Sequence, residues 1–177
     1  MWLTCPLLSM GVKHTVKMDK TPQIQAALDS LNGKSIEVGV FNGEHAWLAH
    51  IHEFGCVIQV TPKMRKYLAA TGLYLKKTTT VITIPERSFL RNGYDTNKGD
   101  VLDVQDQMIG AVADGALDVH SFLEMVGTEL EGKIKEYAVN LNSPGLHPYT
   151  MEHREHGGSN PLSDTGDMIG SISHRIV

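Results

Sequence analysis

The chain has 177 residues, of which 41% are hydrophobic and 20% are charged, enough for one globular domain with its own core. Its formal net charge of −4 argues against a protein that grips nucleic acid through an overall basic surface. The two cysteines, Cys5 and Cys56, are too isolated for a disulfide framework or a zinc knuckle, so a reducing cytoplasm is the expected compartment. No apolar run approaches the ~20 residues that a membrane helix needs.

Residues 1–20 are expected to form an N-terminal arm ahead of a single domain over residues 21–177. The apolar opening lacks a basic start and is interrupted by Pro6, which makes it a poor signal peptide. It is interpreted as an arm, or as the product of a start codon upstream of a true start at Met10. An arm that docks on a neighbouring subunit is the alternative, and the sequence leaves these open. Residues 14–18 alternate polar and apolar side chains, as in a short strand.

The first half of the domain is predicted to alternate helices with strands. Thr21 and Pro22 are typical of an N-cap and the first residue of a helix, which Asn32-Gly33 ends. A strand follows over residues 35–41, and then an amphipathic helix over 45–54 closed by Gly55. Two β-branched runs, at 57–60 and 79–84, predict hairpin strands separated by a partly helical insertion at about 62–77.

The second half is predicted to be mainly helical. One helix is expected over residues 100–116, and Asp118 is a suitable N-cap for a second whose apolar stripe runs from Val119 to Tyr137. Prolines and glycines make residues 142–163 a long loop, and residues 169–177 form a turn into a final strand. The expected fold is α+β: a small mixed or antiparallel sheet packed against helices, two long helices in the C-terminal half, and extended N-terminal and 142–163 arms.

Four segments, in chain order, are similar to a known family. They are residues 51–55 (IHEFG), residues 84–91 (IPERSFLR), residues 115–127 with GAL and FLEMVG, and residues 160–172 with NPLSDTG and MIGSI. Together they resemble the virion-morphogenesis and tail-completion proteins at the head-to-tail junction of tailed phages. The resemblance covers most of the chain from about residue 35 onward, and the insertion and the N-terminal arm lie outside it.

The resemblance implies a structural subunit of the phage head–tail connection: a neck, tail-completion or tail-terminator ring that joins or caps the tail during virion assembly. It implies no catalysis and no cofactor. The expected partners are further copies in a ring, taken to be a hexamer, together with portal, connector or stopper proteins and tail-tube or terminator proteins. DNA would pass through the lumen without specific binding, and no membrane is involved. The protein would reside in the virion after assembly in the bacterial host cytoplasm.

Polar and aromatic residues of these segments and of the 142–163 loop are the candidate subunit contacts. Arg87 and Arg91 are possible charge partners of Glu86, and Glu53 could form a surface ion pair with one of these arginines. Phe89 is expected to be a buried anchor, and Asp164 is expected to cap a short helix. The alternative is that segment 85–91 only caps the sheet and that Asp164 only orders the last strand. The full set of predicted contacts is Glu53, Glu86, Arg87, Phe89, Arg91, His147, Tyr149, Arg154 and Asp164.

Catalytic and nucleic-acid sites were weighed against this interpretation. The histidines lack the His-Glu-x-x-His spacing of a zinc site, and the 100–106 aspartates are typical of a solvated helix face, so neither a metal nor a catalytic residue is predicted. The one basic cluster contains Lys63, Arg65 and Lys66, with tyrosines interleaved. The alternative function is therefore a small DNA-binding accessory protein that uses segment 63–77.

Overall fold

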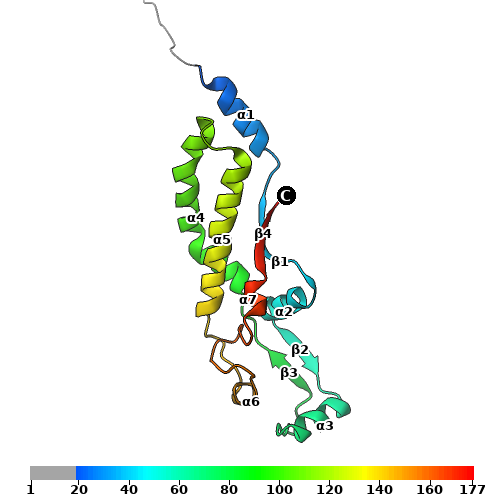
Figure 1. Ribbon diagram of the computed structural model, residues 1–177. Helices are drawn as coiled ribbons and strands as arrows, with labels where there is room; N and C mark the ends of the chain where they lie inside the picture. Colours follow the sequence, from blue (N-terminus) through cyan, green and yellow to red (C-terminus); the bar gives the residue numbers. More distant parts are fainter. Residues whose placement is uncertain (1–18) are drawn as a thin grey trace, which may run out of the picture.

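The computed structural model describes residues 19–177, so the strand expected at 14–18 and nearly all of the predicted arm lie outside the described residues. Within this part the protein is elongated (Figure 1). Helix α1 (Thr21–Leu31) lies at one end and helix α3 (Pro62–Ala70) at the other. Between them, the pair of long helices α4 (Phe89–Ala113) and α5 (Val119–Asn140) runs beside a narrow sheet.

Two antiparallel sheets of two strands each confirm the α+β class. The first pairs β1 (Ile36–Val40) with β4 (Ile172–Ile176), and Val40 lies opposite Ile172. This sheet packs on α5, and the interface between α4, α5 and the sheet forms the core. The largest completely buried side chains are those of Phe89, Val126 and Ile172.

The second sheet is the predicted hairpin with its insertion. Strand β2 (Cys56–Gln59) pairs with β3 (Val81–Ile84), and α3 lies between them in the chain. Thr61 begins α3, because its Oγ1 accepts a hydrogen bond from the Met64 N–H at 3.1 Å. The hairpin extends away from the long helices and places α3 at the far tip (Figure 1).

Two predicted helix starts were wrong. The N-cap of α1 is Lys20, and Thr21 is already helical, its N–H donating to Asp19 Oδ1. Helix α4 begins at Phe89 rather than at residue 100. The helix includes Gly93, where a Cβ would stand only 3.4 Å from Ile134 Cγ1. The missing side chain therefore permits the close approach of α5 at this point. The Asp118 N-cap of α5 is confirmed by its bond from the Ser121 N–H.

The 142–163 segment is more structured than its sequence indicates. It contains the short helix α6 (Pro148–Glu152), and the Asn160 side chain donates to the carbonyls of Ala138 and Val139 at the end of α5. Helix α2 (Gly43–Phe54) and the short helix α7 (Asp167–Gly170) complete the fold. The predicted cap at Asp164 was wrong: Gly166 precedes α7 without a side-chain cap bond. Among the described residues, no helix combines the length and apolarity needed to cross a bilayer.

Candidate functional site

Glu53, at the end of α2, is buried against the start of α4. Its Oε2 accepts the Leu90 N–H at 2.9 Å, and its Oε1 accepts the Arg91 N–H at 3.2 Å. These are free amides of the first turn of α4, where the helix dipole also favours a carboxylate. Ser88 is the N-cap residue by position, but its side chain makes no cap bond. The cap bonds come instead from Glu53, which precedes Ser88 by 35 residues in the chain. This residue therefore joins the IHEFG segment to the IPERSFLR segment.

Arg91 closes this junction on its solvent side. Its Nε lies 2.9 Å from Glu53 Oε1, and its Nη2 lies 2.7 Å from Glu86 Oε1. The Ser88 hydroxyl and Arg91 bind the Glu86 carboxylate and lower the pKa of Glu86. The bond to Glu53, ahead of that to Glu86, raises the pKa of Arg91. The predicted pairing of Glu53 and Glu86 with an arginine is thus confirmed, with one carboxylate buried rather than exposed.

Gly55 fixes the geometry of the same junction. Its φ of +72° lies in the left-handed region, and a Cβ there would stand 2.9 Å from the Ile84 carbonyl oxygen and 3.0 Å from the Glu86 N–H nitrogen. Any side chain would push α2 away from the end of β3. Phe89 lies beside this junction and is completely buried, which confirms it as an anchor and places it in the chain's own core rather than at an exposed contact surface.

Arg87 faces away from that carboxylate network and into the 142–163 segment. Its Nε donates to the Pro144 carbonyl at 2.8 Å and its Nη2 to the Gly145 carbonyl at 3.1 Å. Its Nη1 lies 3.4 Å from His52 Nδ1. Burial, reinforced by the Arg87 charge, lowers the pKa of His52 to about 4, so that this imidazole is neutral at pH 7. Arg87 therefore holds the loop onto the hairpin base.

The other four predicted contacts, three in the loop and Asp164 just after it, lie in two separate pairs, His147 with Tyr149 and Arg154 with Asp164. Tyr149 donates its hydroxyl proton to the Thr71 carbonyl at 3.2 Å, which ties the loop to the end of α3. Arg154 is buried within the loop and donates to the carbonyls of Gly158, Asn160 and Ser163. Asp164 lies 3.5 Å from Arg154 Nε and also accepts the His156 N–H. His147 is exposed, and its Nδ1 accepts the Tyr149 N–H.

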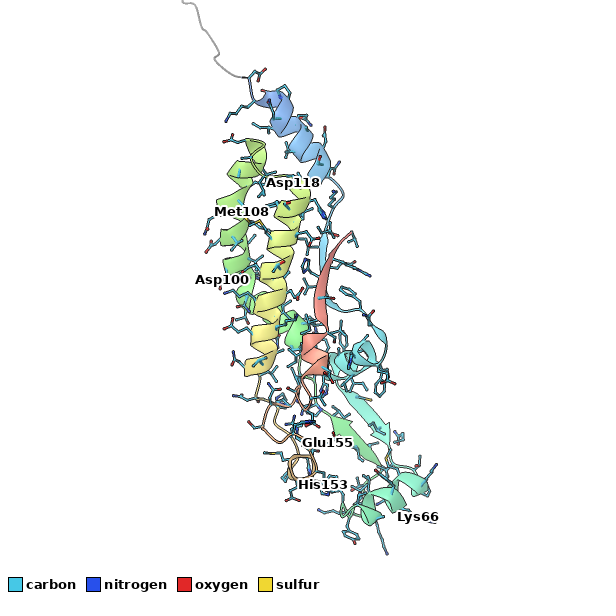
Figure 2. All side chains as sticks on the ribbon, viewed as in Figure 1. Lys66, Asp100, Met108, Asp118, His153 and Glu155 are labelled. Carbon is cyan, nitrogen blue, oxygen red and sulfur yellow. The ribbon has the colours of Figure 1, made fainter. Side chains whose placement is uncertain are left out.

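The predicted basic cluster lies at the α3 tip, where Figure 2 labels Lys66. Lys63 and Lys66 are exposed, and Tyr67 and Tyr74 are also largely exposed. Arg65 differs from the lysines, because its guanidinium donates to the carbonyls that follow α3 in the chain. The acceptors are Leu75 O, Lys76 O and Thr79 O. Arg65 therefore stabilises the fold of the insertion, whereas the side chains of Lys63 and Lys66 are exposed and can contact a ligand.

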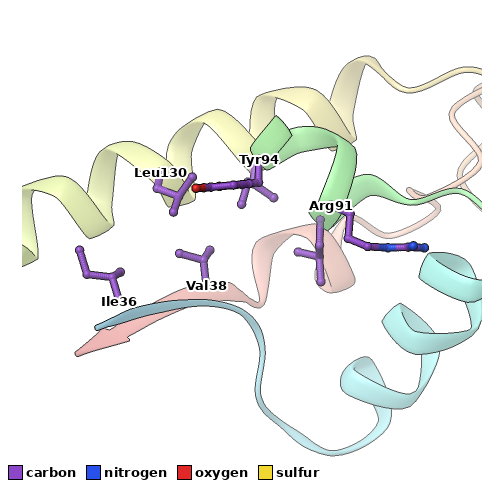
Figure 3. Close-up of a pocket in the computed structure, with 7 residues that line it drawn as sticks. Ile36, Val38, Arg91, Tyr94 and Leu130 are labelled. Carbon is purple, nitrogen blue, oxygen red and sulfur yellow. The ribbon is translucent and has the colours of Figure 1, made fainter. Parts of the chain in front are cut away.

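An open apolar groove lies between β1, the start of α4 and α5. One pocket of about 410 Å³ contains Tyr94 facing Leu130, with Ile36 and Val38 projecting from β1 (Figure 3). A second pocket of about 320 Å³ shares Ile36, Tyr94 and Leu130, so the two adjoin. The charged side chains that line the two pockets are Arg91, Lys34 and Lys98, and no carboxylate of the described residues lines either pocket, so the groove contains no acid–base pair. The sequence shows no groove because its walls come from three separate segments.

Sequence reasoning also missed a histidine held between two carboxylates. His174 Nδ1 lies 2.7 Å from Glu131 Oε2, and His174 Nε2 lies 3.1 Å from Glu124 Oε2. The hydrogen bond to Glu131, followed by that to Glu124, raises the pKa of His174. The ring covers Gly127, where a Cβ would overlap it. No local signal in the sequence identifies these three residues, because His174 lies 43 residues after Glu131 in the chain.

The described residues hold no group of three or more His, Cys, Asp or Glu side chains that could bind a metal. The aspartates at 100, 103 and 106 lie on the exposed side of α4, and Asp100 pairs with Lys133 at 2.7 Å. The contacts above therefore bind segments of the chain to one another and leave apolar surface uncovered. Comparisons with protein-family models, with curated proteins and with solved structures gave no match.

Proposed function

We propose that the protein is a structural subunit of a phage head–tail connection that assembles as a ring and performs no catalysis. The observation that supports this most is the amount of large apolar side chain left exposed along the length of the molecule. Soluble monomers rarely expose contiguous apolar patches, and such patches mark surfaces that another protein covers. The four family-like segments supply the phage assignment.

Two helices present apolar faces to solvent. Helix α1 has no buried residue, and its Ile24 and Leu28, one turn apart, are 41% and 56% exposed. On α2, Trp47 is 67% exposed and Phe54 is 55% exposed. These two residues are seven apart, which places them on the same helix face. A charged or polar residue at these positions would be the ordinary choice for a protein that stays monomeric.

The β2–β3 hairpin is the third uncovered element. Val57 and Val81 lie on the same face of the sheet, with Thr83 opposite Val57, and both valines are exposed. An isolated hairpin of two strands is at best marginally stable in water and needs a covering layer. The hairpin of one subunit seated on the apolar groove of the next would bury both surfaces. Such a head-to-tail contact closes into a ring where the rotation permits.

The remaining parts of the proposal rest on the resemblance and on charge. Portal, connector or stopper proteins would lie on one side of the ring, and tail-tube or terminator proteins on the other. Assembly would take place in the host cytoplasm, with the virion as the final location. A net charge of −4 suits a lumen through which DNA slides, because each phosphate contact by a basic side chain adds affinity.

The oligomeric mass tests the ring directly. Light scattering behind a sizing column should give a multimer at about 100 µM, well above the Kd of a micromolar contact. Val57→Lys with Val81→Lys should remain folded by circular dichroism but become monomeric. The matched control is Val139→Lys, an exposed valine near the end of α5 that belongs to neither the hairpin nor the groove, and this variant should still assemble. A wild-type monomer that also fails to restore head–tail joining to particles lacking the protein would overturn the proposal.

A second candidate function is DNA binding by the α3 tip, and the exposure of Lys63, Lys66 and Tyr67 together favours it. It predicts salt-dependent binding to duplex DNA that Lys63→Glu with Lys66→Glu abolishes. Arg65 should be left in place, because its loss would unfold the insertion. The control is Lys34→Glu with Lys98→Glu, which makes the same charge change away from the tip. Equal binding by both double variants would exclude the tip.

A further inference from the structure

Arg87 is a buried cation that has no counter-ion among residues 19–177. Only 4% of its surface is exposed, and its three hydrogen bonds run to two carbonyl oxygens and an imidazole nitrogen. Within residues 19–177, no carboxylate oxygen lies within 4.0 Å of its guanidinium. Arg91, four residues on, has two carboxylate partners. Buried charges in proteins are normally paired, so the environment of Arg87 is incomplete.

Two N–H groups of Arg87 remain for a ligand. A guanidinium has five N–H donors, and the bonds to Pro144, Gly145 and His52 use three of them. One donor is left on Nη1 and one on Nη2. Two N–H groups on neighbouring nitrogens can match the two oxygens of a carboxylate.

Arg87 also lines a pocket of about 480 Å³. The pocket lies between the end of β3 and the loop that contains α6. Its walls are largely apolar, from Ile82, Ile84, Pro85 and Leu146, and His52 and His147 also line it. This volume accepts a side chain or a small acid.

We propose that this pocket binds a monocarboxylate attached to an apolar group, with Arg87 holding the carboxylate. One guanidinium matches one negative charge, and the apolar walls match the rest of the ligand. A phosphate dianion would require a second cation. The imidazole of His52 is uncharged at pH 7 and does not supply one. The carboxylate can come from a free acid or from an acidic side chain of another protein chain. This inference does not depend on the proposed ring.

Hexanoate is the probe, and hexanamide is its uncharged control of the same shape. Ligand-observed NMR at pH 7 should show saturable hexanoate binding, at least about tenfold weaker hexanamide binding, and an equal loss in Arg87→Met. Arg175→Met, which removes an exposed guanidinium that pairs with Glu37 and does not line the pocket, should leave binding unchanged. Because Arg87→Met removes loop contacts as well, Thr150→Phe provides a second test. It fills the pocket with Arg87 in place and should also abolish binding.

The mass of the protein in solution, measured with and without hexanoate, distinguishes the possible sources of the carboxylate. If hexanoate dissociates an oligomer of the protein, a second copy supplies the carboxylate; if the mass stays constant, a free acid or another protein does. Both results support the site. Equal binding of hexanoate and hexanamide, tighter binding of inorganic phosphate, or full binding by Thr150→Phe would overturn it.

Discussion

Replacing Glu53 by alanine should destabilise the protein by about 3 kcal/mol. Loss of a helix cap costs about 0.5–2 kcal/mol, and leaving the Leu90 and Arg91 N–H groups unsatisfied in a buried place adds about 1–3 kcal/mol. The bond to Arg91 adds less, about 0.2–1 kcal/mol, because the arginine is half exposed and keeps Glu86 as a partner. For a chain of this length the total corresponds to a fall in Tm of about 6–12 °C.

Urea unfolding followed by circular dichroism measures this loss, with the change expected in the midpoint and an unchanged slope. Glu53→Gln should lose about half as much, since its amide oxygen still accepts one backbone N–H while the charge is gone. Asp103→Asn is the control, because Asp103 is an exposed carboxylate on α4, the helix whose first turn Glu53 binds. If Glu53→Ala unfolds at the same urea concentration as Asp103→Asn, the carboxylate does not hold α2 to α4 and the reasoning above fails.

Three further results are expected. Gly55→Ala should lose about 2 kcal/mol or more of unfolding free energy in the same urea assay, because φ is +72° and the Ile84 carbonyl blocks the new Cβ. The pKa of His174 is raised in the folded protein, so the stability that this residue contributes is fully present below the unfolded pKa and is lost as pH rises through the folded pKa. Glu131→Gln should flatten that fall in the urea midpoints measured from pH 6 to 9. Asn160→Ala removes the two N–H donors that bind α5 carbonyls and the oxygen that accepts the Leu162 and Ser163 N–H groups. It should lower stability by about 2 kcal/mol and speed limited proteolysis within residues 142–163, with Ser159→Ala unchanged.

The parts of the fold that the sequence predicted well are those whose signals are local. The Asp118 cap and the apolar stripe of helix α5 lie in one continuous segment, so the sequence of that segment alone predicts the helix and its start. The β2–β3 hairpin was predicted because its β-branched runs and the helical spacing of the insertion between them are also local. Glu53 and Glu86 could be paired with an arginine because the residue types and their spacing limited the choices.

The parts that were missed depend on contacts between distant segments. The early start of α4 was hidden by Gly93, a poor helix former that is favourable here because Ile134 packs against it. Asp164 has the residue type of a cap, but it accepts the His156 N–H instead. The burial of Arg87 could not be read from its sequence neighbours, because its partners lie at His52 and at residues 144–145.

Helix α1 and the β2–β3 hairpin lie at opposite ends of the molecule, and neither contains a fully buried residue. Local stability is therefore lowest at these ends, and their amide hydrogens should exchange through openings that leave the middle of the protein closed. A partner that binds one end has to order that end, which makes a single contact weak and easily reversed. Once both ends are engaged, each raises the effective concentration of the other, and the attachment becomes long-lived without any one contact being strong.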